Sequence, residues 1–186
     1  EKYLNKAEDS NNNFSNYLNT ITKQIKDIEH LVNEFSDFAR MPKPIMKKIA
    51  LNKVITRSLN LLKLSEKDIS FNFIGNNSDI SMKGDEEQIN RVFINLIKNS
   101  IESINEKKRK DVVFKGKINV DIKGDSDYIY VEIKDNGIGF DEVNKAKMLT
   151  PYYTTKIKGT GLGLSIVTKI IYDHNGTILF NSIIWC

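Results

Sequence analysis

The sequence contains few of the residues that cross-link a chain or break its secondary structure, and it has no long apolar run. It has three prolines and one cysteine, Cys186, which is its last residue. A single thiol excludes an intramolecular disulfide framework and favours a reducing compartment, so we expect a cytoplasmic location. No apolar run approaches the roughly 20 residues that a membrane-spanning helix needs, so no transmembrane helix is expected.

Charge and apolar content are those of a globular protein. The 28 basic and 24 acidic side chains give a net charge of +4, and 40% of the residues are apolar, which is enough for a core. Lysine supplies 24 of the cations, and these lysines are scattered along the sequence rather than clustered. A nucleic-acid surface would need clustering on one face, so no nucleic-acid partner is expected.

The first forty residues predict one long helix. Between positions 14 and 39 the apolar residues alternate spacings of four and three, at Phe14, Leu18, Ile21, Ile25, Ile28, Val32, Phe35 and Ala39. This heptad seam favours packing against other helices, although an amphipathic helix folded onto its own domain is the alternative. Pro42 and Pro44 end the pattern. We therefore expect a helix in residues 1–41, a linker in 42–50 and a second domain in 51–186.

The second domain has mixed periodicity. Helical spacing covers residues 50–63, 85–105 and 162–172, and Asp85 is placed to cap the second of these helices. Alternating apolar residues predict strands at 69–73, 117–122, 128–134 and 177–181. The order predicts an α+β fold with a layer of helices on one face of a mixed sheet.

Two asparagines in the second of these helices form the first motif that suggests chemistry. Asn95 and Asn99 are four residues apart and therefore lie on one face of the helix. An amide oxygen is a hard, neutral ligand for Mg²⁺, which also takes water and phosphate oxygens. The plainer alternative is a polar edge of an amphipathic helix.

The second motif is the segment DNGIGF, which begins at Asp135 directly after a predicted strand. An ionised aspartate can accept a hydrogen bond from an exocyclic amine. Gly137 and Gly139 let the backbone approach a ligand or adopt a positive φ. An ordinary Asn-Gly turn is the alternative interpretation.

The third motif is GTGLGL, which begins at Gly159 and opens a helix. Backbone amides at a glycine-rich helix start can bind an anion. The spacing is neither the dinucleotide fingerprint nor a P-loop. The preceding stretch, 141–158, is net positive, with Lys145, Lys147, Lys156 and Lys158, and is typical of a mobile lid.

In this order, the motifs resemble the catalytic domain of two-component sensor histidine kinases, in the gyrase–Hsp90–kinase–MutL superfamily. The family's N, G1, F and G2 boxes are similar to QINRVFINLIKNSIESI, DNGIGF, PYYTTK and GTGLGLSIV. Upstream, IKDIEHLVNEFSDFARMPKP resembles the second dimerisation helix and exit linker of NtrY-type nitrogen-regulation kinases. The resemblance implies a two-layer α/β sandwich, the Bergerat ATP-binding fold.

The resemblance also implies roles for individual residues. Asn99 would coordinate Mg²⁺ and Asn95 would support it; these two are the candidate catalytic residues. Asp135 would accept a hydrogen bond from the adenine amino group of ATP. The remaining nucleotide-binding candidates are glycines and lid residues: Gly137, Gly139, Thr155, Lys156, Gly159, Thr160, Gly161, Leu162 and Gly163.

One difference within the superfamily indicates the type of reaction. The branches that hydrolyse ATP carry a glutamate where this chain has Asn95, and asparagine cannot act as a general base. The sequence therefore favours phosphoryl transfer to a protein nucleophile over hydrolysis.

The acceptor histidine of the family is not found in this sequence. The family places it in an H-E-x-x-N/T-P pattern, which does not occur in the 186 residues. His30 lies on the outward face of the seam, and His174 lies at a helix end, where we expect a capping role. We therefore expect that this chain does not phosphorylate itself and that it acts on an acceptor helix in trans.

The resemblance further implies a response regulator as partner and a homodimer formed through the N-terminal helix. It allows a membrane anchor in segments upstream of Glu1, and the sheet is expected to lack its usual last strand beyond the end at NSIIWC. Two alternatives stay open: an anti-sigma-type serine kinase, and a dimerisation module with a vestigial nucleotide site.

Overall fold

The computed structural model describes residues 2–75, 80–125, 127–141, 145, 147–154 and 159–182. The chain divides into two compact units. The first consists of Glu1–Met41 together with Thr154–Thr160, and the second of Pro42–Tyr153 together with Gly161–Cys186.

The first unit is built on one helix, α1 (Lys2–Ala39), which confirms the predicted long helix and begins before the predicted seam. The seven large apolar side chains of the seam are each 47–63% exposed: Phe14, Leu18, Ile21, Ile25, Ile28, Val32 and Phe35. Neither α1 nor any other helix in the described part of the chain is long and apolar enough to cross a membrane.

The described residues of the second unit form two small sheets. Strands β2 (Ile69–Ile74), β4 (Gly116–Gly124) and β5 (Ile129–Asp135) form the larger one in the order β2-β4-β5. β2 and β4 are parallel while β4 and β5 are antiparallel, so the sheet is mixed, as predicted. Strands β1 (Lys47–Ala50) and β3 (Ser81–Gly84) form a separate antiparallel pair.

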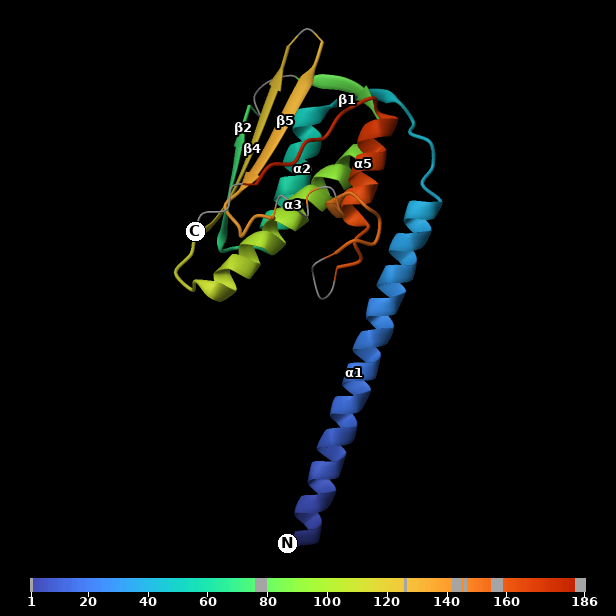
Figure 1. The fold of residues 1–186 in the computed structure, drawn as a ribbon, viewed down its shortest axis with the longest axis vertical. Helices are drawn as coiled ribbons and strands as arrows, with labels where there is room; N and C mark the ends of the chain where they lie inside the picture. The colour runs from blue at the N-terminus through green and yellow to red at the C-terminus, as the bar shows by residue number, and fades with distance from the viewer. Residues whose placement is uncertain are drawn as a thin grey trace. The chain divides into compact units, whose positions relative to one another are not determined.

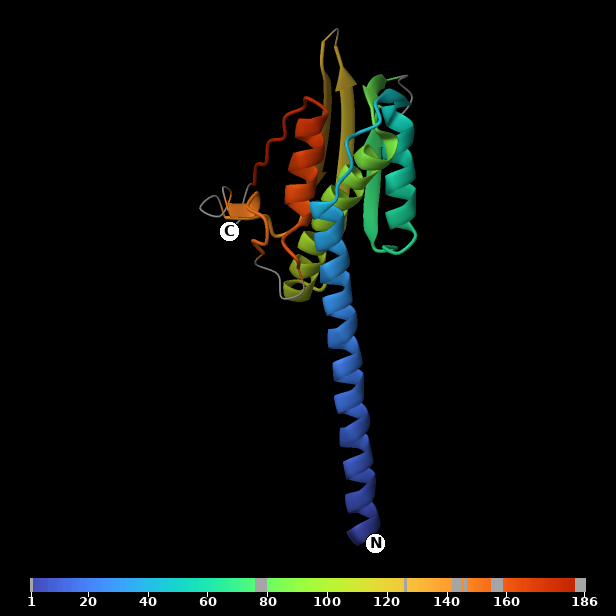
Figure 2. The ribbon, with the colours of Figure 1, turned by 90° about the vertical axis from the view of Figure 1, so that its right-hand side faces the viewer.

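Helices α2 (Leu51–Lys63), α3 (Glu86–Lys110) and α5 (Gly163–Asp173) gather on one side of the larger sheet (Figures 1 and 2). Burial in β4 alternates: every second side chain is in the core, as a sheet covered on one face requires. The core residues of β4 are Ile118, Val120 and Ile122, and the fully buried residues of the helices include Ile55, Ile97, Ile104, Ile166 and Ile170. The predicted fold class, helices on one face of a mixed sheet, is confirmed.

Some predicted boundaries differ from the structure. The segment 42–50, expected to be a linker, contains β1, which pairs with β3. α3 continues to Lys110 rather than ending near position 105. The strand predicted at 177–181 is wrong, because residues 177–182 are all described and have irregular backbone. Leu179 is 84% exposed there, so the apolar alternation does not mark a buried strand face.

Candidate functional site

Helix α3 carries the two candidate asparagines and begins at a well-formed cap. Asp85 Oδ1 accepts hydrogen bonds from the main-chain N–H groups of Glu87 and Gln88, both at 3.1 Å. The predicted cap is confirmed. Asn95 and Asn99 lie in the middle of α3, and both are half-buried. They flank core residues of the same helix, so the site face borders the packed interior.

Asn95 lies beside the start of α5. A Cβ built on Gly163 would be 3.7 Å from Asn95 Oδ1, an ordinary van der Waals distance. α5 packs against α3, and Leu162, just before α5, is fully buried and anchors it there. The first and third sequence motifs are therefore adjacent in space, although nearly seventy positions separate them in the sequence.

The second motif lies at the end of β5. Asp135 is the last residue of that strand, is exposed, and accepts a hydrogen bond from Gly137 N–H through Oδ1 at 2.9 Å. Asn136 ties this turn to β4: its Oδ1 accepts from Lys117 N–H at 2.7 Å, and its Nδ2 donates to Lys115 O at 2.9 Å. The Asp135 carboxylate is thus held on a fixed turn.

Gly137 is required by packing against α3. A Cβ at this position would lie 2.2 Å from Ser103 Oγ and 2.6 Å from Ser103 C, far inside contact distance. Ile138 N–H donates to Ser103 O at 3.3 Å, which fastens the turn to the helix. The glycine therefore lets the turn approach α3, and its predicted approach to a ligand stays a prediction.

Two glycines of the second and third motifs have positive φ. Gly139 and Gly161 both have φ of +70°, a region that favours glycine. A Cβ on Gly161 would be 2.5 Å from Tyr152 C, and Gly161 O accepts a hydrogen bond from Tyr152 N–H at 3.2 Å. Leu162, the next residue, is fully buried, and its predicted contact with the nucleotide stays a prediction.

Not all candidate residues fall in this unit. Thr160 groups with the first unit, where its hydroxyl hydrogen bonds to the Glu34 carboxylate, and Gly159 belongs to the same unit. Thr155 and Lys156 lie outside the described residues. Of the remaining lid lysines, Lys158 also lies outside them, Lys145 Nζ donates to Asn181 Oδ1 at 3.2 Å, and Lys147 is exposed.

Sequence reasoning missed Asn136, Ser103 and the second role of His174. His174 is the C-cap residue of α5, as expected, and Asn175 follows with φ of +57°. Its Nε2 also accepts a hydrogen bond from Asp85 N–H at 2.9 Å. The Asn-Gly dipeptide was a signal for Asn136, but nothing local signalled Ser103 or the bond to Asp85.

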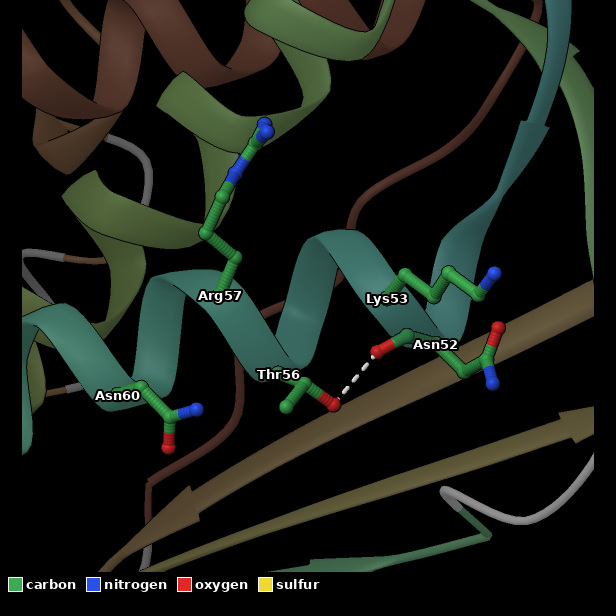
Figure 3. Close-up of a pocket in the computed structure, with 5 residues that line it drawn as sticks. All are labelled: Asn52, Lys53, Thr56, Arg57 and Asn60. Carbon is green, nitrogen blue, oxygen red and sulfur yellow. Dashed lines mark hydrogen bonds between the residues drawn. The ribbon is translucent and has the colours of Figure 1, made fainter.

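A hollow elsewhere on the surface does not belong to this site. It is lined by five polar residues of α2, shown in Figure 3: Asn52, Lys53, Thr56, Arg57 and Asn60. Thr56 Oγ1 donates to Asn52 O at 2.8 Å, and Arg57 pairs with Glu86 at 3.0 Å, so these groups are used within the fold. Among the described residues, no group of three or more His, Cys, Asp or Glu side chains could hold a metal ion.

The comparison with known families agrees with this arrangement. A family described as histidine kinase-, DNA gyrase B-, and HSP90-like ATPase matches residues 84–184, more than half of the chain. The chain belongs to this family. Its mixed sheet with helices on one face is the Bergerat fold of the family, and the matched region contains all three motifs. The family is one of ATP-binding domains.

Individual relatives include histidine kinases. The chain is 34% identical to nitrogen regulation protein NtrY of Azorhizobium caulinodans over 172 residues, which are 90% of this chain and 22% of that protein. The catalytic domain of histidine kinase ThkA matches with a TM-score of 0.59 and 32% identity, over 69% of this chain and 80% of that one.

ThkA in complex with the response regulator protein TrrA matches with a TM-score of 0.68 and 28% identity. That match covers 86% of this chain and 44% of the ThkA chain. The chain spans about a quarter of the length of the NtrY-type relatives.

Proposed function

We propose that this chain is the ATP-binding catalytic part of a two-component sensor histidine kinase of NtrY type. It would transfer the γ-phosphoryl group of ATP to a histidine on a dimerisation helix supplied in trans, for relay to a response regulator. Family membership, the NtrY relatives and the ThkA–TrrA complex support this proposal. Because the chain spans only 22% of the NtrY relative, the activity of a whole kinase is part of the proposal.

The observation that carries the proposal is the position of Asn95 beside Gly163. The start of α5, where Gly163 has no side chain, lies next to the face of α3 that carries the amides of Asn95 and Asn99. Backbone N–H groups at such a helix start attract phosphate oxygens. We assign Gly161, Leu162 and Gly163 to the phosphates through their backbones, and we keep Gly159, Thr160, Thr155 and Lys156 as predicted phosphate contacts.

The donor set fits Mg²⁺. Asn99 presents a neutral oxygen ligand one turn beyond Asn95, on a half-buried face. Mg²⁺ prefers oxygen ligands, keeps several waters and takes phosphate oxygens, so it needs only one or two protein ligands. Asn99 would coordinate the ion, and Asn95 would support Asn99 in that role. When bound, the ion would neutralise phosphate charge during phosphoryl transfer.

Asp135 is proposed to select the base. Gly137 N–H holds Oδ1, which fixes the carboxylate and directs Oδ2 as the acceptor for an exocyclic amine. Adenine presents an amino group where guanine presents a carbonyl, and a carboxylate would repel that carbonyl. Gly139, with its positive φ, shapes the loop beyond. This arrangement favours ATP over GTP.

The proposed reaction is transfer rather than hydrolysis. Asn95 occupies the position where a general base for water would be needed, and an amide cannot accept the proton. The residues of this chain therefore bind, orient and neutralise the nucleotide, and the nucleophile comes from the acceptor histidine.

We also propose that α1 pairs with a second copy of the chain. Its seven large apolar seam residues are exposed within the single chain, and heptad seams of this kind form helical bundles. The acceptor helix in trans and the response regulator complete the proposed partners, and a cytoplasmic location is proposed for this part of the kinase.

Radiolabelled phosphate tests the proposal and its alternatives together. The chain is incubated with γ-labelled ATP, Mg²⁺ and the dimerisation hairpin of an NtrY-type kinase, which carries the acceptor histidine. We expect acid-labile, alkali-stable label on the hairpin, none on this chain alone, and none when the acceptor histidine is replaced by glutamine. Acid-stable label on a serine substrate would instead support the serine kinase. Binding of the hairpin with no ATP binding would support the vestigial module.

A further inference from the structure

The segment that precedes β1 is attached to the start of α3. Ile45 N–H donates to Asp85 Oδ2 at 2.8 Å, and Gln88 Nε2 donates to Pro42 O at 2.9 Å. The Ile45 side chain is 67% exposed, so this segment is not held by burial of that side chain. The hydrogen bond that the Asp85 side chain accepts and the one that Gln88 donates therefore hold residues 42–46 against the domain.

Asp85 also connects this attachment to α5. Its main-chain N–H donates to His174 Nε2 at 2.9 Å, and His174 Nδ1 donates to Ile170 O at 2.7 Å. The second bond fixes the tautomer in which Nε2 is the acceptor. Gly84 allows this approach, because a Cβ there would lie 3.2 Å from His174 Cδ2. The start of α3 and the end of α5 thus share one junction.

Little free chain separates this junction from α1. Arg40 N–H still donates to Ser36 O at 2.9 Å, so helical bonding reaches the last turn of α1. Only the residues from Met41 to Pro44 then precede the bond at Ile45, and two of them are prolines with fixed φ. Such a short, proline-containing connection has few soft dihedrals.

We propose that Asp85, Gln88 and His174 are positioning residues that dock the linker segment 42–46 onto the catalytic unit. The dock limits the directions in which α1 can leave that unit. It also joins the linker to the two helices whose residues form the candidate site, since α3 carries Asn95 and Asn99 and α5 begins at Gly163. A movement of α1 would thereby act on the candidate site of α3 and α5 through the linker.

The structural part of this inference is independent of ATP. Its functional part, that docking supports phosphoryl transfer in trans, rests on the proposed function.

Three variants separate docking from capping. Asp85→Asn keeps one good cap acceptor, but its single amide oxygen cannot serve both the α3 amides and Ile45 N–H. Gln88→Met keeps the length and helix propensity of the side chain and removes the donor to Pro42 O. Glu87→Gln is the matched control, because Glu87 is exposed in the same turn and contributes only its main-chain N–H.

Hydrogen exchange at the Ile45 amide tests the dock, with the core amide of Ile97 as the reference. In the unmodified chain we expect Ile45 to exchange slowly despite its exposed side chain. In Asp85→Asn we expect exchange at the Ile45 amide to be at least about tenfold faster. If the new side-chain amide oxygen instead accepts from Ile45 N–H, the amides at the start of α3 should exchange faster. Equal exchange at both places in Asp85→Asn and the unmodified chain would overturn the inference.

A distance measurement tests the effect on α1. Spin labels are placed at Tyr17→Cys and Lys123→Cys in a Cys186→Ser background, and the labelled chain is diluted with unlabelled chain to suppress signals between copies. The dock predicts a broader distance distribution in Gln88→Met and Asp85→Asn than in Glu87→Gln. Equal widths in all three would overturn it.

Phosphotransfer separates this inference from the proposed function. We expect Gln88→Met to slow transfer to the acceptor hairpin by at least about tenfold while its affinity for ATP stays within about twofold. Unchanged transfer with a broadened distance distribution would overturn the functional part. If the unmodified chain does not bind ATP, the proposed function fails, while the exchange and distance results still decide the dock.

Discussion

Gly137 and Ser103 approach so closely that a methyl group on Gly137 would lie 2.2 Å from Ser103 Oγ. This contact joins the turn after β5 to the middle of α3. It places the Asp135 carboxylate at a fixed position relative to the helix that carries Asn99. The spacing of the candidate base-selecting and metal-binding residues therefore depends on one glycine.

Gly137→Ala is expected to destabilise the fold. The added carbon would collide with the backbone and side chain of Ser103, so the turn must move away from α3. Overpacking of this kind costs about 1–3 kcal/mol. Urea unfolding followed by circular dichroism measures the loss, and an unfolding midpoint equal to that of the unmodified chain would contradict this packing role.

Gly163→Ala is the matched comparison, and it is expected to weaken ATP binding without destabilising the fold. The new Cβ would be 3.7 Å from Asn95 Oδ1, which is an ordinary contact, and alanine favours a helix by up to about 1 kcal/mol over glycine. Stability should be unchanged or increased. Affinity for ATP should fall by at least about tenfold, because the methyl group occupies the proposed phosphate side of Asn95. Full affinity in this variant would argue against phosphate binding there.

The stability of the second unit should depend on the ionisation of Asp85. Partial burial raises the pKa of this carboxyl, but hydrogen bonds from the N–H groups of Ile45, Gln88 and Glu87 outweigh this effect and hold the pKa below its ordinary value. A lowered folded-state pKa contributes stability above the unfolded value, and this contribution is lost as pH falls through the folded one.

The corresponding experiment compares the unmodified chain with Asp85→Asn by urea unfolding at about pH 6 and about pH 3. We expect the unmodified chain to be the more stable of the two at the higher pH. Its advantage should shrink at the lower pH. An advantage that grows on acidification would show that the sign is wrong.

Asp135→Ala should reduce the preference for ATP over GTP. It removes the oxygen proposed to accept from the adenine amino group, so ATP affinity should fall by at least about tenfold, while GTP affinity should not fall. Competition between the two nucleotides measures this ratio. Glu132→Gln, an exposed change on the same strand, is expected to leave the ratio unaltered.

Periodicity predicted the elements whose burial follows a regular pattern. α3 and α5 were placed to within a few residues because their apolar faces repeat along the chain, and the cap at Asp85 was visible as a local signal. The pair β1 and β3 was missed. Each strand has only four residues, and their pairing joins parts of the chain that are distant in sequence.

The strand predicted at 177–181 failed because alternation alone does not provide a partner strand. Leu179 is exposed, and nothing local could indicate that the ladder would not form. The packing contact of Gly137 was missed for a related reason, since its neighbour Ser103 comes from another element. The motifs located the candidate site, but its packing contacts are long-range and were invisible to local patterns.

The most direct test of the proposed Mg²⁺–ATP site at Asn99 is calorimetric titration with ATP in the presence and absence of Mg²⁺. The titration is carried out on the unmodified chain, Asn99→Ala and Asn60→Ala. Asn60 is an exposed asparagine on α2 and serves as the matched control. Thermal unfolding first establishes that each variant is folded. We expect Mg²⁺-dependent binding to the unmodified chain and to Asn60→Ala, and at least about tenfold weaker binding to Asn99→Ala in Mg²⁺. Equal affinity of Asn99→Ala and the unmodified chain in Mg²⁺ would contradict the proposed site.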